Sequence, residues 1–322
     1  MRSPRSSPAP GAEPHGRAVS CVAAGVLAAL ALLLAACGGG GDPLAETPQG
    51  PSAPDTVRVG SADFPENRLL AEIYATGLST RGVTVERRFG IGSREKYFPD
   101  LRDGSVDLVP DYTGNLLRYL DPQATATAPA DVYAGIGRRL PPPLVLLAPS
   151  AAEDKDAVVV TRAFATANNV RSIADLTRFC PTTVFGGPPE FATRPYGIPG
   201  LARTYGCTFR EFRPLDSGGP LTVAALRAGT VAAADLFSTD PSIPANDFVI
   251  LDDPRSNFAA QQVVPLIDSA KLANPAVADV LNRISQKLDT STLTDLNRRL
   301  DAPDKPDPAQ VARDWLSSAG IG

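Results

Sequence analysis

Strand-like and helix-like segments alternate along the chain from residue 57 onward. The segment 65–79 shows the pattern well, because Pro65 suits a first helical position and the apolar residues after it follow the helical period. The expected strands are 56–60, 83–89, 106–109, 144–148, 157–161, 182–185, 208–212, 232–237, 248–251 and 262–267. The expected helices are 65–79, 96–102, 114–120, 200–205, 275–288, 293–300 and 308–318. This alternation predicts an α/β protein with parallel sheets.

The number of strands and the length of the chain favour two sheets over one. The regions after 144–148 and before residue 262 look like crossings between two lobes. No internal repeat of fixed period is present.

The N-terminal segment has the features of an export signal. Arg2, Arg5 and Arg17 precede an uncharged apolar run, 18–34, which leads to Ala36 and Cys37. The pattern is typical of a bacterial lipobox, so we expect 1–36 to be a signal peptide and Cys37 to be the lipidated first mature residue. A retained membrane-spanning helix is the alternative, but such a helix needs about 20 apolar residues.

Residues 37–56 follow as an expected flexible tether, because Gly and Pro dominate them and no apolar period is present. The predicted location is the extracytoplasmic face of the cell membrane, with the lipid on Cys37 as the anchor.

Charge and histidine content exclude several classes of function. The whole chain has 31 basic and 35 acidic residues, and the part from Cys37 onward has 28 and 34, a net charge of −6. A mildly acidic chain offers no electrostatic footprint for nucleic acid. The single histidine, His15, lies in the segment expected to be removed, which excludes Ser-His-Asp and Cys-His catalysis from the mature chain. Chemistry based on carboxylates or lysine remains open.

Two of the four cysteines remain for the folded part of the chain. Cys21 lies in the apolar run and Cys37 in the lipobox, which leaves Cys180 and Cys207. Each precedes a strand-like run, and parallel strands of a β-α-β unit start at the same edge of a sheet. We therefore expect a disulfide in an exported protein. Two free buried thiols are the alternative.

Cofactor and metal motifs are absent or weak. No glycine run ends in Gly-Lys-Ser/Thr, and the Gly90-Ile91-Gly92 stretch lacks the third glycine of a dinucleotide-binding turn. The acids Asp154 and Asp156 flank a lysine and are interpreted as part of a solvated loop. We expect no cofactor and no metal.

Five loops at the expected carboxyl ends of strands carry the polar and aromatic residues of interest. They are 61–66, 92–97, 110–114, 187–191 and 237–240. Ligands of open α/β sheets bind at this edge, and several of these loops run into helix N-termini, which suit an anion. Three loops place an aromatic residue beside a polar group, as a cage for a quaternary ammonium would require. Taken singly, each aromatic residue belongs more often to a core than to a site.

A resemblance to a known family rests on these same residues. The first motifs are VRVGSADFPENRLLAEIYATGL and GIGSREKYFPDLRDGSVDLVPDYTGNLLRYL, and the later ones are GGPPEFATRPYGIPGL, LDSGGPLTVAALRAGTVAAADLFSTDPSI and FVILDD. In this order they resemble the glycine betaine/carnitine/choline-binding proteins of bacterial osmoprotectant ABC importers. The resemblance covers roughly 57–300, and Asp-Tyr-Thr-Gly at 111–114 is its most specific part.

The resemblance implies a two-lobed periplasmic-binding-protein fold, type II-like, with the ligand cleft between the lobes. The first lobe would comprise 57–150 and 257–322, and the second lobe 151–256. Tyr97 and Tyr112 match cage positions of the first lobe, Phe237 matches an aromatic position of the second, and Arg194 matches an arginine that reaches a ligand carboxylate. Two positions depart from the family: Thr222 replaces a cage tyrosine and Ala62 replaces a lysine. The expected ligand-binding residues are Ser61, Asp63, Phe64, Arg94, Tyr97, Asp111, Tyr112, Arg194, Thr222, Phe237, Thr239 and Asp240.

The leading hypothesis is a monomeric binding protein, not an enzyme, that delivers a zwitterionic or cationic quaternary-ammonium osmolyte to an ABC permease. A binding protein for another small polar solute is the first alternative. An exported hydrolase that works with two carboxylates is the second, for which Asp111 and Asp240 are the candidates.

Overall fold

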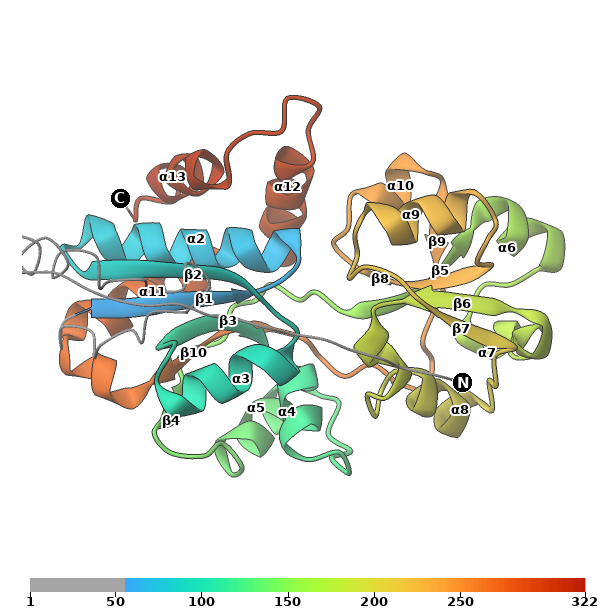
Figure 1. The fold of residues 1–322 in the computed structure, drawn as a ribbon, viewed down its shortest axis with the longest axis horizontal. Helices are drawn as coiled ribbons and strands as arrows, with labels where there is room; N and C mark the ends of the chain where they lie inside the picture. The colour runs from blue at the N-terminus through green and yellow to red at the C-terminus, as the bar shows by residue number, and fades with distance from the viewer. Residues whose placement is uncertain (1–55, 322) are drawn as a thin grey trace, which may run out of the picture. The chain divides into compact units, whose positions relative to one another are not determined.

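The computed structural model describes residues 56–321, and these residues build two five-stranded sheets (Figure 1). The first sheet has the strand order β2-β1-β3-β10-β4 and the second has β7-β6-β8-β5-β9. The strands of the first sheet are β1 (Thr56–Ala62), β2 (Thr84–Gly92), β3 (Leu108–Tyr112), β4 (Leu144–Leu146) and β10 (Val263–Asp268). Those of the second are β5 (Asp156–Thr161), β6 (Val184–Gly187), β7 (Glu211–Pro214), β8 (Ala233–Phe237) and β9 (Phe248–Ile250). We call each sheet with the helices packed on it a lobe.

Helices cover both faces of the first sheet, and two separate apolar clusters mark the two faces. The helices of one face are α2 (Pro65–Thr80), α11 (Pro275–Lys287), α12 (Thr290–Leu300) and α13 (Pro308–Ser318), which share one cluster with β1. Those of the other face are α3 (Arg94–Asp103), α4 (Thr113–Leu120) and α5 (Pro129–Gly137). Leu69, Leu70 and Ile73 of α2 are fully buried, so the periodic residues of the sequence do face the core.

The second sheet is covered in the same way by shorter helices. The helices α6 (Arg162–Asn168), α7 (Ile173–Leu176) and α8 (Ile198–Tyr205) share one apolar cluster. The helices α9 (Pro220–Arg227) and α10 (Ser242–Ala245) contribute to another cluster. Three short 3₁₀ segments complete the elements: η1 (Cys180–Thr182), η2 (Pro189–Ala192) and η3 (Ser269–Ala273).

The prediction of an α/β fold is confirmed, but the expectation of parallel sheets is wrong in part. Strands β1, β2 and β3 are parallel to one another, and so are β6, β7 and β8. Strand β10 runs antiparallel to β3 and β4, and β5 runs antiparallel to β8 and β9. Each of these two strands is the first strand after a crossing between the sheets. No helix precedes it to bring the chain back to the edge at which the parallel strands start, so the strand runs in the opposite direction.

The crossings lie between β4 and β5 and between β9 and β10. All strands of the first sheet except β10 therefore precede the second lobe, and β10 with helices α11 to α13 returns to the first. Helices α5, α6, α7, α9 and α10 had no counterpart among the expected elements. They span only four to nine residues each, too short for a period of 3.6 to stand out.

A disulfide joins Cys180 to Cys207, whose Cα atoms lie 5.5 Å apart. Cys180 lies in η1 just before β6, and Cys207 precedes β7 in a stretch without regular structure. Because β6 and β7 are parallel neighbours, the two cysteines meet at the shared starting edge of these strands. Both side chains are fully buried in the second lobe.

Within 56–321, the helices are too short or too polar to cross a bilayer. The expected signal peptide, Cys37 and the tether up to residue 55 lie outside the described residues, whereas residue 56, expected as the end of the tether, starts β1.

Candidate functional site

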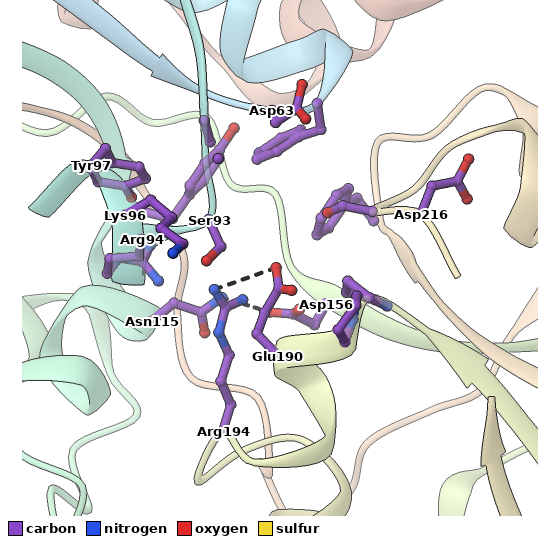
Figure 2. A pocket seen from close by; sticks show the side chains of 18 of the residues that line it. Asp63, Ser93, Arg94, Lys96, Tyr97, Asn115, Asp156, Glu190, Arg194 and Asp216 are labelled. Atoms are coloured by element: carbon purple, nitrogen blue, oxygen red, sulfur yellow. Dashed lines mark hydrogen bonds and ion pairs between the residues drawn. The ribbon is translucent and has the colours of Figure 1, made fainter. Parts of the chain in front are cut away.

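A pocket of about 450 Å³ lies between the two lobes, at the carboxyl ends of the parallel strands of both sheets (Figure 2). On the first lobe it is lined by the loops that follow β1, β2 and β3, and on the second by the loops that follow β6, β7 and β8. This is the edge at which open α/β sheets bind ligands. The order of strands and helices therefore places loops from both lobes around one space.

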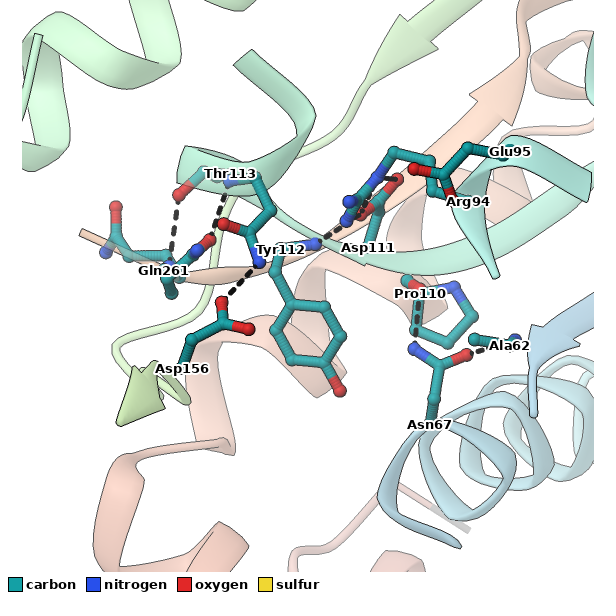
Figure 3. A network of polar contacts seen from close by, with 12 residues as sticks. Ala62, Asn67, Arg94, Glu95, Pro110, Asp111, Tyr112, Thr113, Asp156 and Gln261 are labelled. Atoms are coloured by element: carbon teal, nitrogen blue, oxygen red, sulfur yellow. Dashed lines mark hydrogen bonds and ion pairs between the residues drawn. The ribbon is translucent and has the colours of Figure 1, made fainter. Parts of the chain in front are cut away.

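Three first-lobe helices start at this pocket, and their caps are residues of the site. Phe64, Ser93 and Tyr112 are the N-cap residues of α2, α3 and α4, and all three line the pocket. Asn67 holds two of these loops together from the buried side of α2. Its side chain accepts a hydrogen bond of 2.7 Å from the Ala62 amide and donates one of 2.9 Å to the Pro110 carbonyl (Figure 3).

Four aromatic side chains line the pocket: Phe64, Tyr97, Tyr112 and Phe237. The Phe64 ring centre lies 6.0 Å from that of Tyr112 and 4.9 Å from that of Phe237. The second of these contacts joins the lobes, since Phe237 ends β8. Burial, with the neighbouring carboxylates, raises the pKa of Tyr112 well above its ordinary value. The phenol is therefore neutral at physiological pH.

A buried ion pair lies behind the aromatic residues. The guanidinium of Arg94 lies 2.5 Å from the Asp111 carboxylate, which also accepts the Tyr112 amide at 2.6 Å (Figure 3). Burial alone would lower the pKa of Arg94, but Asp111 outweighs it and raises that pKa well above the ordinary value. Asp111 is fully buried and does not line the pocket. The pair fixes the backbone at Tyr112.

A second ion pair joins the lobes directly. Arg194 of the second lobe donates hydrogen bonds of 3.1 and 2.9 Å to the two carboxylate oxygens of Glu95 in α3. Its guanidinium also lies 3.7 Å from Glu190. Burial opposes ionisation of Glu95, yet Arg194 outweighs burial and lowers the pKa of Glu95 from 4.5 to about 2.

Acidic side chains outnumber basic ones around the pocket. The lining acids are Asp63, Asp154, Asp156, Glu190 and Asp216, and the lining bases are Arg94, Lys96 and Arg194. Figure 2 shows Asn115, Asp156, Glu190 and Arg194 gathered on one side of the pocket. Some of these acids are held as well, since Asp63 pairs with Arg68 and Glu190 lies 3.7 Å from Arg194. The lining as a whole still carries more acidic than basic groups, which suits a ligand with positive charge better than an anion.

The interpretation of Asp154 and Asp156 as a solvated loop is wrong. Both are only 4 % exposed. Asp156 starts β5 opposite Phe237, and its carboxylate accepts a hydrogen bond of 2.7 Å from the Asn115 side chain of the first lobe. Burial raises the pKa of Asp156. The crossing between the lobes carries these acids into the interior, which a local pattern of charges does not reveal.

A cluster of buried polar groups connects the lobes beneath the pocket. The carboxylate of Glu66 in α2 accepts hydrogen bonds from the hydroxyls of Tyr112, at 2.7 Å, and Thr239, at 2.6 Å, and from the side chain of Asn297. The amide of Thr239 in turn donates to Asp154 at 3.0 Å. Burial raises the pKa of Glu66 and, together with the charge of Glu66, raises that of Asp154 well above its ordinary value.

Of the twelve expected ligand-binding residues, seven line the pocket. They are Asp63, Phe64, Arg94, Tyr97, Tyr112, Arg194 and Phe237. Lining residues that the expected set lacked include Lys96, Asn115, Asp156, Glu190 and Asp216. Lys96 and Glu190 belong to loops that the sequence does indicate, whereas no sequence signal marks Asp156.

The other five expected residues lie behind the pocket surface. The Ser61 hydroxyl accepts the Gly90 amide at 2.8 Å, which ties β1 to the end of β2. Thr222 bonds to Asp216, whose carboxylate accepts the first amides of α9. Thr239 belongs to the cluster around Glu66, Asp111 pairs with Arg94, and Asp240 accepts the Ser242 amide at 2.8 Å.

The hydrolase alternative gains no support from this arrangement. Its candidates, Asp111 and Asp240, belong to different lobes, and neither lines the pocket. Among residues 56–321, no group of three or more acidic, histidine or cysteine side chains is arranged to hold a metal ion.

Comparison with known proteins assigns the chain to a family. The model of OpuAC, the substrate binding domain of ABC-type glycine betaine transport systems, matches residues 55–318. The chain belongs to this family. It is therefore a substrate-binding domain of this class of transport system, and the resemblance inferred from the sequence motifs is confirmed.

Individual relatives agree with the family. A glycine-betaine-binding protein of Pseudomonas aeruginosa is 27 % identical over 277 residues, which are 81 % of this chain and 87 % of that protein. The glycine betaine-binding protein YehZ of Escherichia coli is 26 % identical over 281 residues, 83 % of this chain and 92 % of that protein. A crystal structure of a glycine betaine/carnitine/choline ABC transporter protein matches with a TM-score of 0.64 and 21 % identity, over 82 % of this chain and 99 % of the other. The last match supports the two-lobed periplasmic-binding-protein fold.

Proposed function

We propose that the protein captures a quaternary-ammonium solute between its lobes and delivers it to an ABC permease without catalysing a reaction. The observation that carries the proposal is the contact between Phe64 of the first lobe and Phe237 of the second, beside Tyr112. The family and the named relatives, which bind glycine betaine, support the choice of solute class.

The aromatic residues suit a methylated cation for a physical reason. A trimethylammonium head has no hydrogen-bond donor, so dispersion and the negative faces of aromatic rings supply the attraction. Each desolvated ring contributes about 0.5–2 kcal/mol. We place the head group among Phe64, Tyr97, Tyr112 and Phe237, which are the aromatic residues of the pocket.

The charges around the pocket refine the proposal. Arg94 and Arg194 are held by acids, and Lys96 is the lining base for which no ion pair is found among residues 56–321. A carboxylate on the ligand would meet Lys96 but also the buried acid Asp156. We therefore expect choline, which carries only the positive charge, to bind at least as tightly as glycine betaine.

The cellular setting follows from the family and from the N-terminal sequence. A binding protein that works with a permease must be held outside the membrane, and lipidation at Cys37 would provide the tether. We propose a monomer of this kind, with 57–150 and 257–322 as one lobe and 151–256 as the other. The cleft between them would close on the ligand by a hinge.

Calorimetric titration of the purified chain tests the proposed ligand class. Choline, glycine betaine, carnitine and proline betaine are titrated, with ethanolamine and glycine as controls that lack the methyl groups. The proposal expects binding of at least one methylated compound and none of either control. Binding of neither methylated cations nor methylated zwitterions rejects the assignment, and another small polar solute then becomes the leading candidate.

A pair of matched variants tests the site. Phe237→Ala removes a half-buried ring of the pocket and should weaken the binding of choline about tenfold, in line with one desolvated cation–π contact. Phe164→Ala removes a half-buried ring that packs on Phe179 elsewhere in the second lobe, and should leave affinity unchanged. Equal affinities of the two variants would show that Phe237 does not contact the ligand.

A further inference from the structure

Next to the main pocket is a second cavity, of about 170 Å³, between the lobes. Arg94, Asn115 and Arg194 line both spaces, so the two are neighbours. Arg118 of α4 and Tyr196 of the second lobe line the second cavity but not the main pocket. Its volume exceeds what a single water molecule occupies.

Arg118 is a buried cation for which residues 56–321 supply no counter-ion. It is 8 % exposed, and its Nε atom is buried with no hydrogen-bond partner in the described part of the chain. No ion pair or hydrogen bond joins its side chain to any residue of 56–321. A buried guanidinium left this way costs free energy unless an anion or ordered water satisfies it.

Tyr196, which lines the same cavity from the other lobe, is also unpaired within residues 56–321. Tyr196 is 3 % exposed, and its hydroxyl has no hydrogen-bond partner among the described residues. Two buried donors from different lobes thus line one cavity, and neither finds an acceptor among residues 56–321. Tyr196 also lies near Arg194, whose guanidinium carbon is 5.9 Å from the ring centre.

The charged side chains that line the cavity leave one unbalanced positive charge. Glu95 is the acid that lines it, and Arg194 neutralises Glu95. Arg94 is neutralised by Asp111, so the charge of Arg118 remains. Burial and the nearby Arg203 lower the pKa of Arg118, as expected of a cation that lacks a partner.

We propose that this cavity is a site for a small monovalent anion, bound between Arg118 of the first lobe and Tyr196 of the second. One unbalanced charge suits chloride or a carboxylate better than a dianion such as sulfate. An ordered anion would satisfy donors from both lobes and so link them. The carboxylate of a zwitterionic ligand in the main pocket has the same chemistry as a free anion, and the experiment separates these two sources.

The first arm uses inorganic halide and no organic ligand. The melting temperature of the full chain is followed against sodium chloride or bromide, with sodium sulfate at matched ionic strength as the control. We expect a saturable rise with halide alone, because an anion that binds only the folded state stabilises it. Bromide-soaked crystals should show an anomalous peak between Arg118 and Tyr196.

Two charge-matched variants make this arm specific. Arg118→Gln should abolish the halide response, whereas Arg138→Gln removes an exposed charge after α5 and should keep it. Tyr196→Phe removes only the unpaired hydroxyl and should weaken the response, which gives a second variant if Arg118→Gln does not fold.

The second arm rests on the proposed function. In halide-free sulfate buffer, glycine betaine and choline are titrated into the wild type and Arg118→Gln. If the ligand carboxylate fills the cavity, the variant loses about tenfold in affinity for glycine betaine and keeps its affinity for choline. If a free anion fills it, both affinities stay and only the halide response is lost.

The proposal is overturned if Arg118→Gln and the wild type respond equally to halide and bind both ligands equally. An anomalous map without bromide at this cavity, together with a melting temperature that ignores halide, would exclude a free anion. Because the halide arm contains no quaternary amine, its result does not depend on whether the proposed function is correct.

Discussion

The hydroxyl of Tyr112 donates a hydrogen bond of 2.7 Å to Oε1 of Glu66, a residue 46 positions earlier in the chain. Tyr112 presents its ring to the pocket, while Glu66 receives Thr239 from the second lobe and Asn297 from α12. The side chain of Tyr112 therefore belongs both to the proposed ligand site and to the polar cluster between the lobes.

Tyr112→Phe should separate these two roles. The ring stays, so affinity for choline should change less than about threefold, whereas Tyr112→Ala should lose tenfold or more. Loss of the bond to a buried carboxylate should lower the free energy of unfolding by about 1–3 kcal/mol. Denaturant unfolding and calorimetric titration measure the two effects.

Tyr133→Phe is the matched control, because its hydroxyl bonds to the Leu147 carbonyl at 3.1 Å in a half-buried position outside the pocket. Tyr133→Phe should lower the free energy of unfolding by less than Tyr112→Phe does. A larger loss of stability in the control than in Tyr112→Phe would contradict the importance of the Glu66 cluster.

The raised pKa values of Glu66 and Asp154 predict that stability falls as pH rises. A carboxyl whose pKa is higher in the folded protein than in the unfolded chain binds its proton more tightly when folded. Its contribution is complete below the unfolded pKa, 3.8 for Asp154, and is lost as pH rises through the raised value. Tyr112, Thr239 and Asn297 surround the pair without supplying a cation.

Asp154→Asn tests this directly. Asparagine keeps the acceptor for the Thr239 amide and mimics the protonated acid, so the variant should lose less stability than the wild type does as the pH is raised above 3.8. The slope of unfolding free energy against pH, from denaturant titrations, is the measurement. Parallel slopes for the two proteins would show that Asp154 does not titrate in this range.

The lowered pKa of Glu95 predicts the opposite dependence at acid pH. With a folded value of about 2 and an ordinary value of 4.5, its contribution is present above 4.5 and is lost as pH falls through 2. Glu95→Gln should therefore reduce the acid sensitivity of stability in this window. Glu86→Gln, which removes an acid paired with Arg88 within β2, is the control. No difference between the two variants would rule out a special role for the Glu95–Arg194 pair.

The disulfide should contribute substantially to the second lobe. Cys180 and Cys207 are 27 positions apart, and closing a loop of this length stabilises by about 3–4 kcal/mol in the chain-entropy model. The double variant Cys180→Ser, Cys207→Ser should lose most of that stability in denaturant unfolding. Alkylation of the unfolded, unreduced wild type should label neither cysteine. Labelling of both would mean that the thiols are free.

Local sequence patterns predict all ten strands, the helices of ten or more residues and the edge of the sheets at which the pocket lies. Strong local signals explain this success: Pro65 and the apolar period of α2, and the strand-to-helix loops that contain Phe64, Tyr97 and Tyr112. The direction of β5 and β10 was out of reach, because it depends on where the chain crosses between lobes rather than on any local pattern.

For the charged residues of the site, too, the sequence predicts some of the contacts and the tertiary structure decides the others. Arg94 and Arg194 were expected as ligand contacts, and the structure adds that Asp111 and Glu95 already hold them. The charged residues next to Asp156 in the sequence indicate a solvated loop. In the structure Asp156 is buried in β5, at the pocket edge opposite Phe237. Pairing and burial of charges are properties of distant residues brought together.

By itself, the sequence determined the alternation of strands and helices, the family and the aromatic loops, because these depend on residues that are neighbours along the chain. Only the tertiary structure decided which side chains reach the pocket, which carboxylates are buried, and that Arg118 and Tyr196 lie at one cavity without partners among residues 56–321. The physical reason is that burial and pairing arise when two sheets, separated in the sequence, place their loops against each other.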